Sequence, residues 1–322
     1  MHTSGVSDLY NYIPYSLKEG KTVQWLKTGN IPYTDPFFDT TLFKIKYLPE
    51  NQKKFKSSSS VDMLSVWSKE QASIKPSAII FHVSRCGSTL LSQLLSLNEK
   101  HIVLSEVPFF DDLLRSKYKE NGKDYSHLLK DAVAFYGQKR KGNEEQLFIK
   151  ADSWHLFFYE EWRAIYPQIP FILLFRRPDE VVRSQMKNKG LHAVPGMIEK
   201  EIFQLGELPE VGGAYEIHVA AVLEQYYKKM QQIAVIDNNV HLFNYKDGIE
   251  NIALKVLHSS GIQFGKGSED LYNERMHFDA KDPYKVFDEK PLSGLNTDEH
   301  LQNAFMAYKA LDAIRKSSLQ QV

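Results

Sequence analysis

The chain has 322 residues, of which 43% are hydrophobic and 25% charged, the composition of an ordinary globular protein. Its 40 Lys and Arg balance its 40 Asp and Glu, which argues against a protein that wraps nucleic acid through a basic excess. The single cysteine excludes a disulfide within the chain and favours a reducing compartment. We find neither the apolar run of a secretory signal nor a stretch approaching the ~18 apolar residues of a membrane span. We therefore expect a cytoplasmic protein.

Residues 1–76 are predicted to form an N-terminal extension packed on a core, and residues 77–322 to form one α/β domain. No linker rich in Pro, Ser or Gly divides the chain near its middle. The extension shows no clear period, and we interpret serines 57–60 as a loop that joins it to the core. Its candidate packing residues are Trp25, Leu26, Phe37, Phe38 and Phe43.

Short apolar runs along the core predict buried strands, at residues 78–83, 102–104, 147–150, 171–175 and 241–243. Helical patterns lie between them, a long amphipathic helix is expected at about 215–236, and the C-terminus is expected to be helical from about 298. Strands that alternate with helices predict a P-loop-like, three-layer α/β fold with a mostly parallel sheet and helices on both faces.

The loop after the first core strand has the features of an anion site. Helix-initial amides lack partners within the helix, and the helix dipole favours an anion there. Gly87 permits close backbone approach, Ser88 and Thr89 add hydroxyl groups, and Arg85 adds a charged fork. A nucleoside triphosphate loop of the form G-x-x-x-x-G-K-[ST] is broken, because His82 replaces its first glycine and Ser88 its lysine.

A second motif follows the clearest buried strand. Arg176 leaves the strand end, where open α/β sheets bind ligands, and Pro178 suits the first turn of the next helix. Ser184 comes eight residues after Arg176, about two helical turns on, where its side chain can face back toward that edge.

Together these motifs resemble the PAPS-dependent sulfotransferases, with tyrosylprotein sulfotransferases and their bacterial relatives closest in pattern. The resemblance implies 3′-phosphoadenosine 5′-phosphosulfate (PAPS) as donor and adenosine 3′,5′-bisphosphate as product. The 5′-phosphosulfate loop of the family matches Arg85-Cys86-Gly87-Ser88-Thr89 followed by Leu90, and its 3′-phosphate site matches Arg176 and Ser184. Two further matches are to the nucleotide: Tyr245, in a stretch where Asn244 stands in place of the family's arginine, and Lys290 in a C-terminal Lys-Pro element.

The resemblance also implies the catalytic residues. Glu106 stands where tyrosylprotein sulfotransferases have their base, and Lys150 where related enzymes have a lysine at a strand end that contacts the phosphosulfate. With Arg85, Lys150 would stabilise negative charge on the bridging oxygen. His155 is the alternative base. No metal is required, and the histidines lack the paired spacing of zinc ligands.

Two other functions are left open by the sequence: a P-loop kinase or NTPase, which would bind ATP with magnesium, and a non-catalytic nucleotide-binding protein. The partner of the expected reaction is a hydroxyl acceptor, for which tyrosine, sugars, lipids and small phenols are all compatible. Residues 187–213, rich in Gly and Pro, are predicted to form a lid on the acceptor side.

Overall fold

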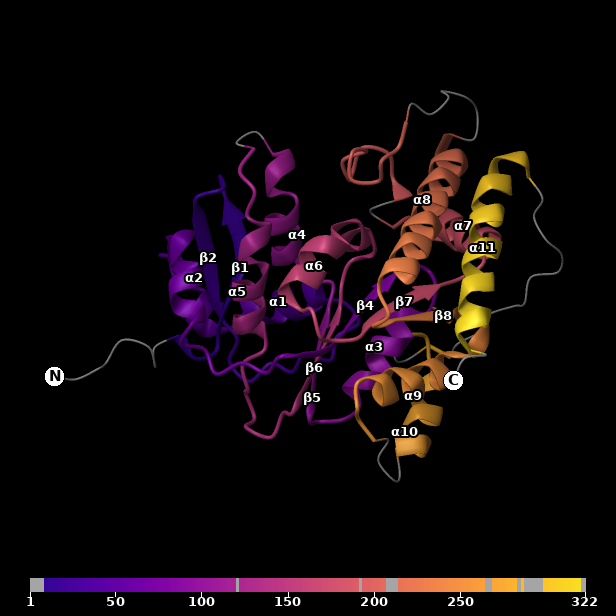
Figure 1. The fold of residues 1–322 in the computed structure, drawn as a ribbon. Helices are drawn as coiled ribbons and strands as arrows, with labels where there is room; N and C mark the ends of the chain where they lie inside the picture. The colour runs from indigo at the N-terminus through magenta and orange to yellow at the C-terminus, as the bar shows by residue number, and fades with distance from the viewer. Residues whose placement is uncertain are drawn as a thin grey trace. The chain divides into compact units, whose positions relative to one another are not determined.

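The computed structural model describes residues 9–119, 122–190, 193–206, 214–263, 268–282, 285–286 and 298–319 (Figure 1). The chain divides into two compact units, which are described separately below. Unit 1 comprises residues 1–77, 95–150 and 161–167, and unit 2 comprises residues 78–94, 151–160 and 168–322.

The central sheet has five strands in the order β5-β6-β4-β7-β8. β5 pairs with β6, β4 with β7, and β7 with β8, and each of these pairs is parallel. The predicted α/β fold with a parallel sheet flanked by helices is confirmed. Each strand coincides with a predicted apolar run to within two residues at either end: β4 (Pro76–His82), β5 (His101–Ser105), β6 (Gln146–Lys150), β7 (Phe171–Phe175) and β8 (Val240–Asn244).

Unit 1 carries β5, β6 and a second, antiparallel sheet of order β1-β2-β3 that the sequence did not predict. The serine run interpreted as a loop is wrong at this point, because residues 58–60 pair with β2. Polar serines are tolerated there because the strand is short and lies at the edge of its sheet, with two of its three residues exposed. The elements of this sheet and its helices are β1 (Tyr12–Lys18), β2 (Thr22–Lys27), β3 (Ser58–Ser60), α1 (Phe38–Lys46), α2 (Asp62–Ser68), α4 (Pro108–Leu114), α5 (Leu129–Tyr136) and most of α6 (Tyr159–Ile165).

Aromatic rings fill the core of unit 1. Trp25 of β2 meets Phe135 of α5 with ring centroids 4.8 Å apart, and Phe38 of α1 meets Tyr136 at 5.3 Å. These edge-on contacts bury large side chains from the N-terminal segment, as the sequence predicted for Trp25, Leu26 and Phe38. Phe43 is the exception: 62% of it is exposed, because it lies on the outer face of α1.

Unit 2 surrounds β4, β7 and β8 with helices. In Figure 1, α7, α8 and α11 gather on one side of β7 and β8, and α3 and α9 on the other. The predicted long helix is α8. The elements are α3 (Ser88–Ser96, whose last two residues count with unit 1), α7 (Pro178–Lys187), α8 (Ala214–Ile236), the single turn η7 (Tyr245–Asp247), α9 (Ile249–Ser259), α10 (Ser268–Met276) and α11 (Gln302–Leu319). Among the described helices, none combines the length and apolar character needed to cross a bilayer.

Candidate functional site

The loop between β4 and α3 has an unusual backbone. Ser84, Arg85 and Gly87 all adopt positive φ angles, of 62°, 50° and 83°. Left-handed conformations are costly for residues other than glycine and persist where surrounding contacts impose them. One such contact comes from His82 at the end of β4, whose Nδ1 accepts the amide of Ser84 at 3.1 Å. The opposite ring nitrogen, Nε2, then carries the proton and donates to the carbonyl of Ala151 at 3.1 Å.

Gly87 is fixed by space as well as by conformation. A Cβ atom at this position would lie 2.5 Å from Cδ1 of Ile249 and 2.8 Å from Cε2 of Tyr245. Both neighbours belong to the segment after β8, so the loop and this segment are in direct contact within unit 2. Only glycine satisfies both demands.

The other loop residues divide between buried and accessible. Cys86 is fully buried, and its Sγ lies 3.6 Å from the carbonyl oxygen of Leu174. Ser88, the first residue of α3, is also buried, whereas Thr89 and Leu90 are half-buried. Arg85 is half-buried too, and its Nη2 donates to the carbonyl of Asn188 just after α7. The loop therefore presents a guanidinium beside the first turn of a helix.

Arg176 joins three segments of unit 2. It follows β7, and its guanidinium lies over the ring of Tyr245 at 4.0 Å from the centroid. Its Nη1 donates to the carbonyl of Arg85 at 3.3 Å, and its Nε pairs with Glu180 of α7 at 2.7 Å. The anion loop, the Arg-x-Pro motif and the Tyr245 turn, which lie far apart in the sequence, are thus neighbours.

Ser184 lies on α7 as predicted and is half-buried. Its neighbour Gln185, which sequence reasoning missed, is fully buried and reaches the loop: its Nε2 donates to Oγ of Ser84 at 3.3 Å, while its Oε1 accepts the amide of Gly190 at 2.7 Å. A buried amide on a helix gives no sequence signal, because glutamine is common on exposed helical faces.

A polar network around the Tyr245 turn was also missed. Asn244, the last residue of β8, is 1% exposed, and its amide nitrogen donates to Asp312 of α11 at 3.1 Å. Arg315 donates to Asp312 at 2.8 Å and to Asp247 at 2.7 Å. A buried guanidinium thus stands beside the turn in which Asn244 replaces the family's arginine. The signal was not readable because Arg315 lies some 70 residues further along the chain.

In unit 1, Glu106 and Lys150 form a salt bridge at the carboxyl ends of β5 and β6. Lys150 Nζ lies 2.6 Å from Oε1 of Glu106, and the exposed fractions of the two side chains are 0% and 21%. The backbone supports the pair, since the amide of Glu106 donates to the carbonyl of Lys150 at 2.8 Å and Glu106 has a φ of 57°. Nζ also lies 5.0 Å from the ring centroid of Phe37.

Carboxyl groups gather around Glu106 in unit 1. Loss of solvation, reinforced by the charge of Glu106, raises the pKa of Asp111 well above its usual value, although Arg115 opposes the shift. Loss of solvation also raises the pKa of Asp39; Lys46 opposes this, and Glu106 adds a smaller upward contribution. Glu106 therefore has neighbours that hold protons more tightly than ordinary carboxyl groups.

Three of the predicted features need separate comment. His155 is fully buried with its ring centroid 4.3 Å from that of Trp154, in unit 2. Lys290 lies outside the described residues. The predicted lid at 187–213 is only partly described, since 191–192 and 207–213 fall outside.

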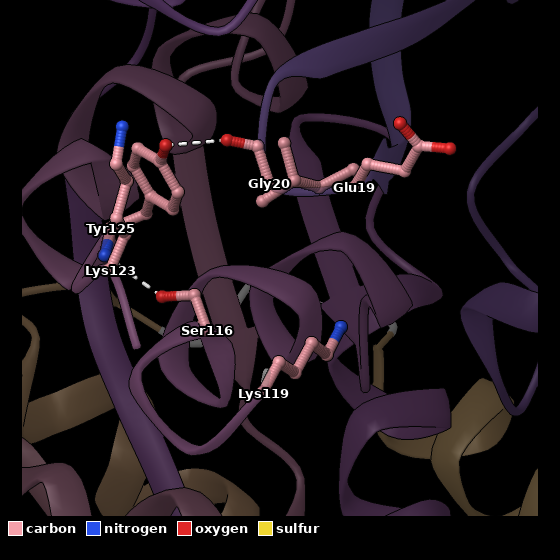
Figure 2. A pocket seen from close by; sticks show the side chains of 7 residues that line it. Glu19, Gly20, Ser116, Lys119, Lys123 and Tyr125 are labelled. Atoms are coloured by element: carbon pink, nitrogen blue, oxygen red, sulfur yellow. Dashed lines mark hydrogen bonds between the residues drawn. The ribbon is translucent and has the colours of Figure 1, made fainter. Parts of the chain in front are cut away.

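A cavity of about 180 Å³ in unit 1 contains none of the predicted site residues (Figure 2). The hydroxyl of Tyr125 donates to the carbonyl of Gly20 across it, and Oγ of Ser116 accepts the amide of Tyr125 at 2.8 Å. Lys119 pairs with Asp112 at 2.9 Å. Its lining residues are Leu17, Glu19, Gly20, Ser116, Lys119, Lys123 and Tyr125. Across the described part of the chain, no group of three or more His, Cys, Asp or Glu residues is arranged to hold a metal ion.

No protein-family model and no curated protein matches the sequence. Three crystal structures are similar to the chain. They are sulfotransferase STF1 from Mycobacterium tuberculosis H37Rv (TM-score 0.42, 10% identity, 64% of this chain and 72% of that one), a sulfotransferase from Alicyclobacillus acidocaldarius (0.40, 16%, 75% and 96%) and the sulfotransferase domain from the curacin biosynthetic pathway (0.41, 16%, 67% and 80%). All three are sulfotransferases, the family that the two sequence motifs resemble.

Proposed function

We propose that this protein is a sulfotransferase that uses PAPS as donor and a hydroxyl compound as acceptor. One observation carries the proposal: the guanidinium of Arg176 contacts both the carbonyl of Arg85 in the anion loop and the ring of Tyr245. Three segments that resemble nucleotide-binding elements of one family are thereby neighbours in unit 2.

The residues present fit a nucleotide with two anionic ends. The first amides of α3, with Arg85 beside them, suit the 5′-phosphosulfate, because helix-initial amides and guanidinium forks both bind anion oxygens. Arg176 and Ser184 suit the 3′-phosphate. Arg176 is already held by Glu180 and by stacking on Tyr245, which limits the side-chain entropy lost on binding.

The donor supplies the sulfuryl group, and the chain's own residues manage charge and protons. We assign Glu106 as the base that accepts the proton of the acceptor hydroxyl while its oxygen bonds to sulfur and the bond from sulfur to the nucleotide oxygen breaks. Lys150 and Arg85 are assigned to the negative charge that develops on the leaving oxygen. Lys150 is suited to this role because a cation without solvent around it interacts strongly with nearby charge.

Calorimetry tests donor binding. We expect adenosine 3′,5′-bisphosphate to bind at least about tenfold more tightly than ATP with magnesium. Arg176→Lys should weaken bisphosphate binding by about tenfold, because lysine lacks the planar fork and stacks less well on Tyr245. Arg183→Lys, on the same helix, is the control and should bind normally. Tighter binding of ATP with magnesium would overturn the proposal in favour of an NTPase.

Turnover is measured separately as transfer of labelled sulfate from PAPS to a panel of tyrosine peptides, sugars, lipids and phenols. Glu106→Gln is expected to lower turnover by roughly a hundredfold or more while leaving bisphosphate affinity unchanged. Unchanged turnover would exclude Glu106 as the base and leave His155. Binding without transfer to any acceptor would identify a non-catalytic nucleotide-binding protein.

A further inference from the structure

The turn that carries Tyr245 is held from both sides by a single carboxylate on α11. Asp312 accepts hydrogen bonds from the side-chain amide of Asn244 at 3.1 Å and from Nζ of Lys246 at 2.6 Å. These two residues immediately precede and follow Tyr245 in the sequence. No other residue between them separates the ring from its anchors.

Asn244 has the one side chain that can perform both of its tasks. Its Oδ1 accepts the amide of Lys246 at 3.2 Å, and Oδ2 of Asp247 accepts the amide of Asn244 at 3.2 Å, so the two side chains close the η7 turn reciprocally. The amide nitrogen of Asn244 is left facing Asp312 and the hydroxyl of Tyr308, which lies 2.9 Å away. The turn is therefore linked to α11 through a side chain whose orientation is fixed by its own bonds.

Charge holds the network in its bonded form. Arg315, 5% exposed, bridges Asp312 and Asp247. Burial on its own would raise the pKa of Asp312, but hydrogen bonds from Lys246, Arg315 and Asn244 outweigh it and lower that pKa far below its usual range. Asp312 is thus a carboxylate throughout the physiological range.

The anchored ring lies where the proposed donor site is assembled. Tyr245 stacks on the guanidinium of Arg176 at 4.0 Å, and its Cε2 would be 2.8 Å from a Cβ at position 87. Any movement of the η7 turn therefore moves the surface on which Arg176 rests. Resting on the proposed function, we infer that Asp312 is a positioning residue, which acts through Tyr245 to hold Arg176 for the 3′-phosphate of the nucleotide.

The inference is tested by comparing two nucleotides that differ in the 3′-phosphate. Calorimetry with adenosine 3′,5′-bisphosphate and with adenosine 5′-monophosphate gives a ratio of affinities for each variant. We expect Asp312→Asn to weaken bisphosphate binding by roughly tenfold and monophosphate binding by less than about twofold, because only the former nucleotide engages Arg176. The matched control is Glu224→Gln, which neutralises a paired carboxylate on α8 of the same unit and should leave the ratio unchanged.

Folding of each variant is checked by circular dichroism and by its unfolding midpoint. If Asp312→Asn does not fold, Tyr308→Phe replaces it: the ring packing against Tyr227 is retained and the contact with Asn244 is lost, with an expected reduction of the ratio by roughly threefold. An unchanged ratio in a folded variant, or an equal loss for both nucleotides, overturns the positioning role. If the wild-type chain itself shows no preference for the bisphosphate, the proposed function fails, and the inference fails with it.

Discussion

The two units hold their candidate charged residues in opposite ways. In unit 1, Lys150 is fully enclosed and bound to one partly exposed carboxylate, that of Glu106. In unit 2, Arg85 and Arg176 remain partly accessible and are held by main-chain carbonyls, with an aromatic ring beneath Arg176. Removing a partner from the first arrangement exposes the cost of a buried charge, whereas disturbing the second changes mainly geometry. Substitutions in the two units should therefore fail differently.

The largest effect is expected for Lys150→Met. Loss of the buried cation leaves the Glu106 carboxylate without its salt bridge, and breaking a buried pair in this way costs about 3 kcal/mol. Urea unfolding measures the change. The control is Lys100→Met, which removes a pair with Glu145 whose side chains are 55% and 54% exposed, and should cost less than about 0.5 kcal/mol. Equal losses for both variants would show that burial does not distinguish the two pairs.

A smaller effect is expected for Gly87→Ala in unit 2. Alanine at φ 83° is strained by about 1 kcal/mol, and its Cβ would also displace Ile249 and Tyr245 at a further cost of about 1–2 kcal/mol. Gly261→Ala is the matched control, because φ is 72° there and nothing lies within 4 Å of the added carbon. The unfolding free energies of the two variants should differ by the steric contribution alone. Identical values would mean that the loop moves aside freely.

The smallest effect concerns acid stability. Because the pKa of Asp312 is lower in the folded chain than in the unfolded chain, the unfolded state binds the proton more readily as the pH falls. The stabilisation is complete above the unfolded value, about pH 4, and is lost progressively below it. We expect roughly 1 kcal/mol, since solvent reaches the network through Lys246 and Lys316. Unfolding of wild type and Asp312→Asn from pH 7 to 3 should converge; parallel curves would contradict the assignment.

The sequence predicted the central sheet well because its strands are continuous apolar runs. Phe171–Phe175 is buried at every position, and a run of this kind has few alternatives to a covered strand. The antiparallel sheet of unit 1 was not predicted, because Ser58–Ser60 carry no apolar pattern and their pairing with β2 depends on partners more than 30 residues away. Local patterns report burial, and they do not report which distant strand supplies the edge.

The candidate site was predictable to the same extent. Arg85, Gly87 and Arg176 follow strands in a parallel sheet, whose carboxyl ends share an edge, and the three are neighbours in unit 2. Their supporting residues were not predictable. Gln185 and Asp312 act through contacts made by helices that return from elsewhere in the chain, and nothing in their own sequence neighbourhood distinguishes them from solvated residues.

The complete burial of Cys86 turns the chain's only thiol into an internal reporter. A thiol in this position reacts with a modifying reagent only when the loop around it opens, so the rate of alkylation measures the local opening equilibrium of this segment rather than global unfolding alone. Since one residue supplies the whole signal, the reading needs no engineered label. Any molecule that closes over the loop should slow that reaction in proportion to its occupancy.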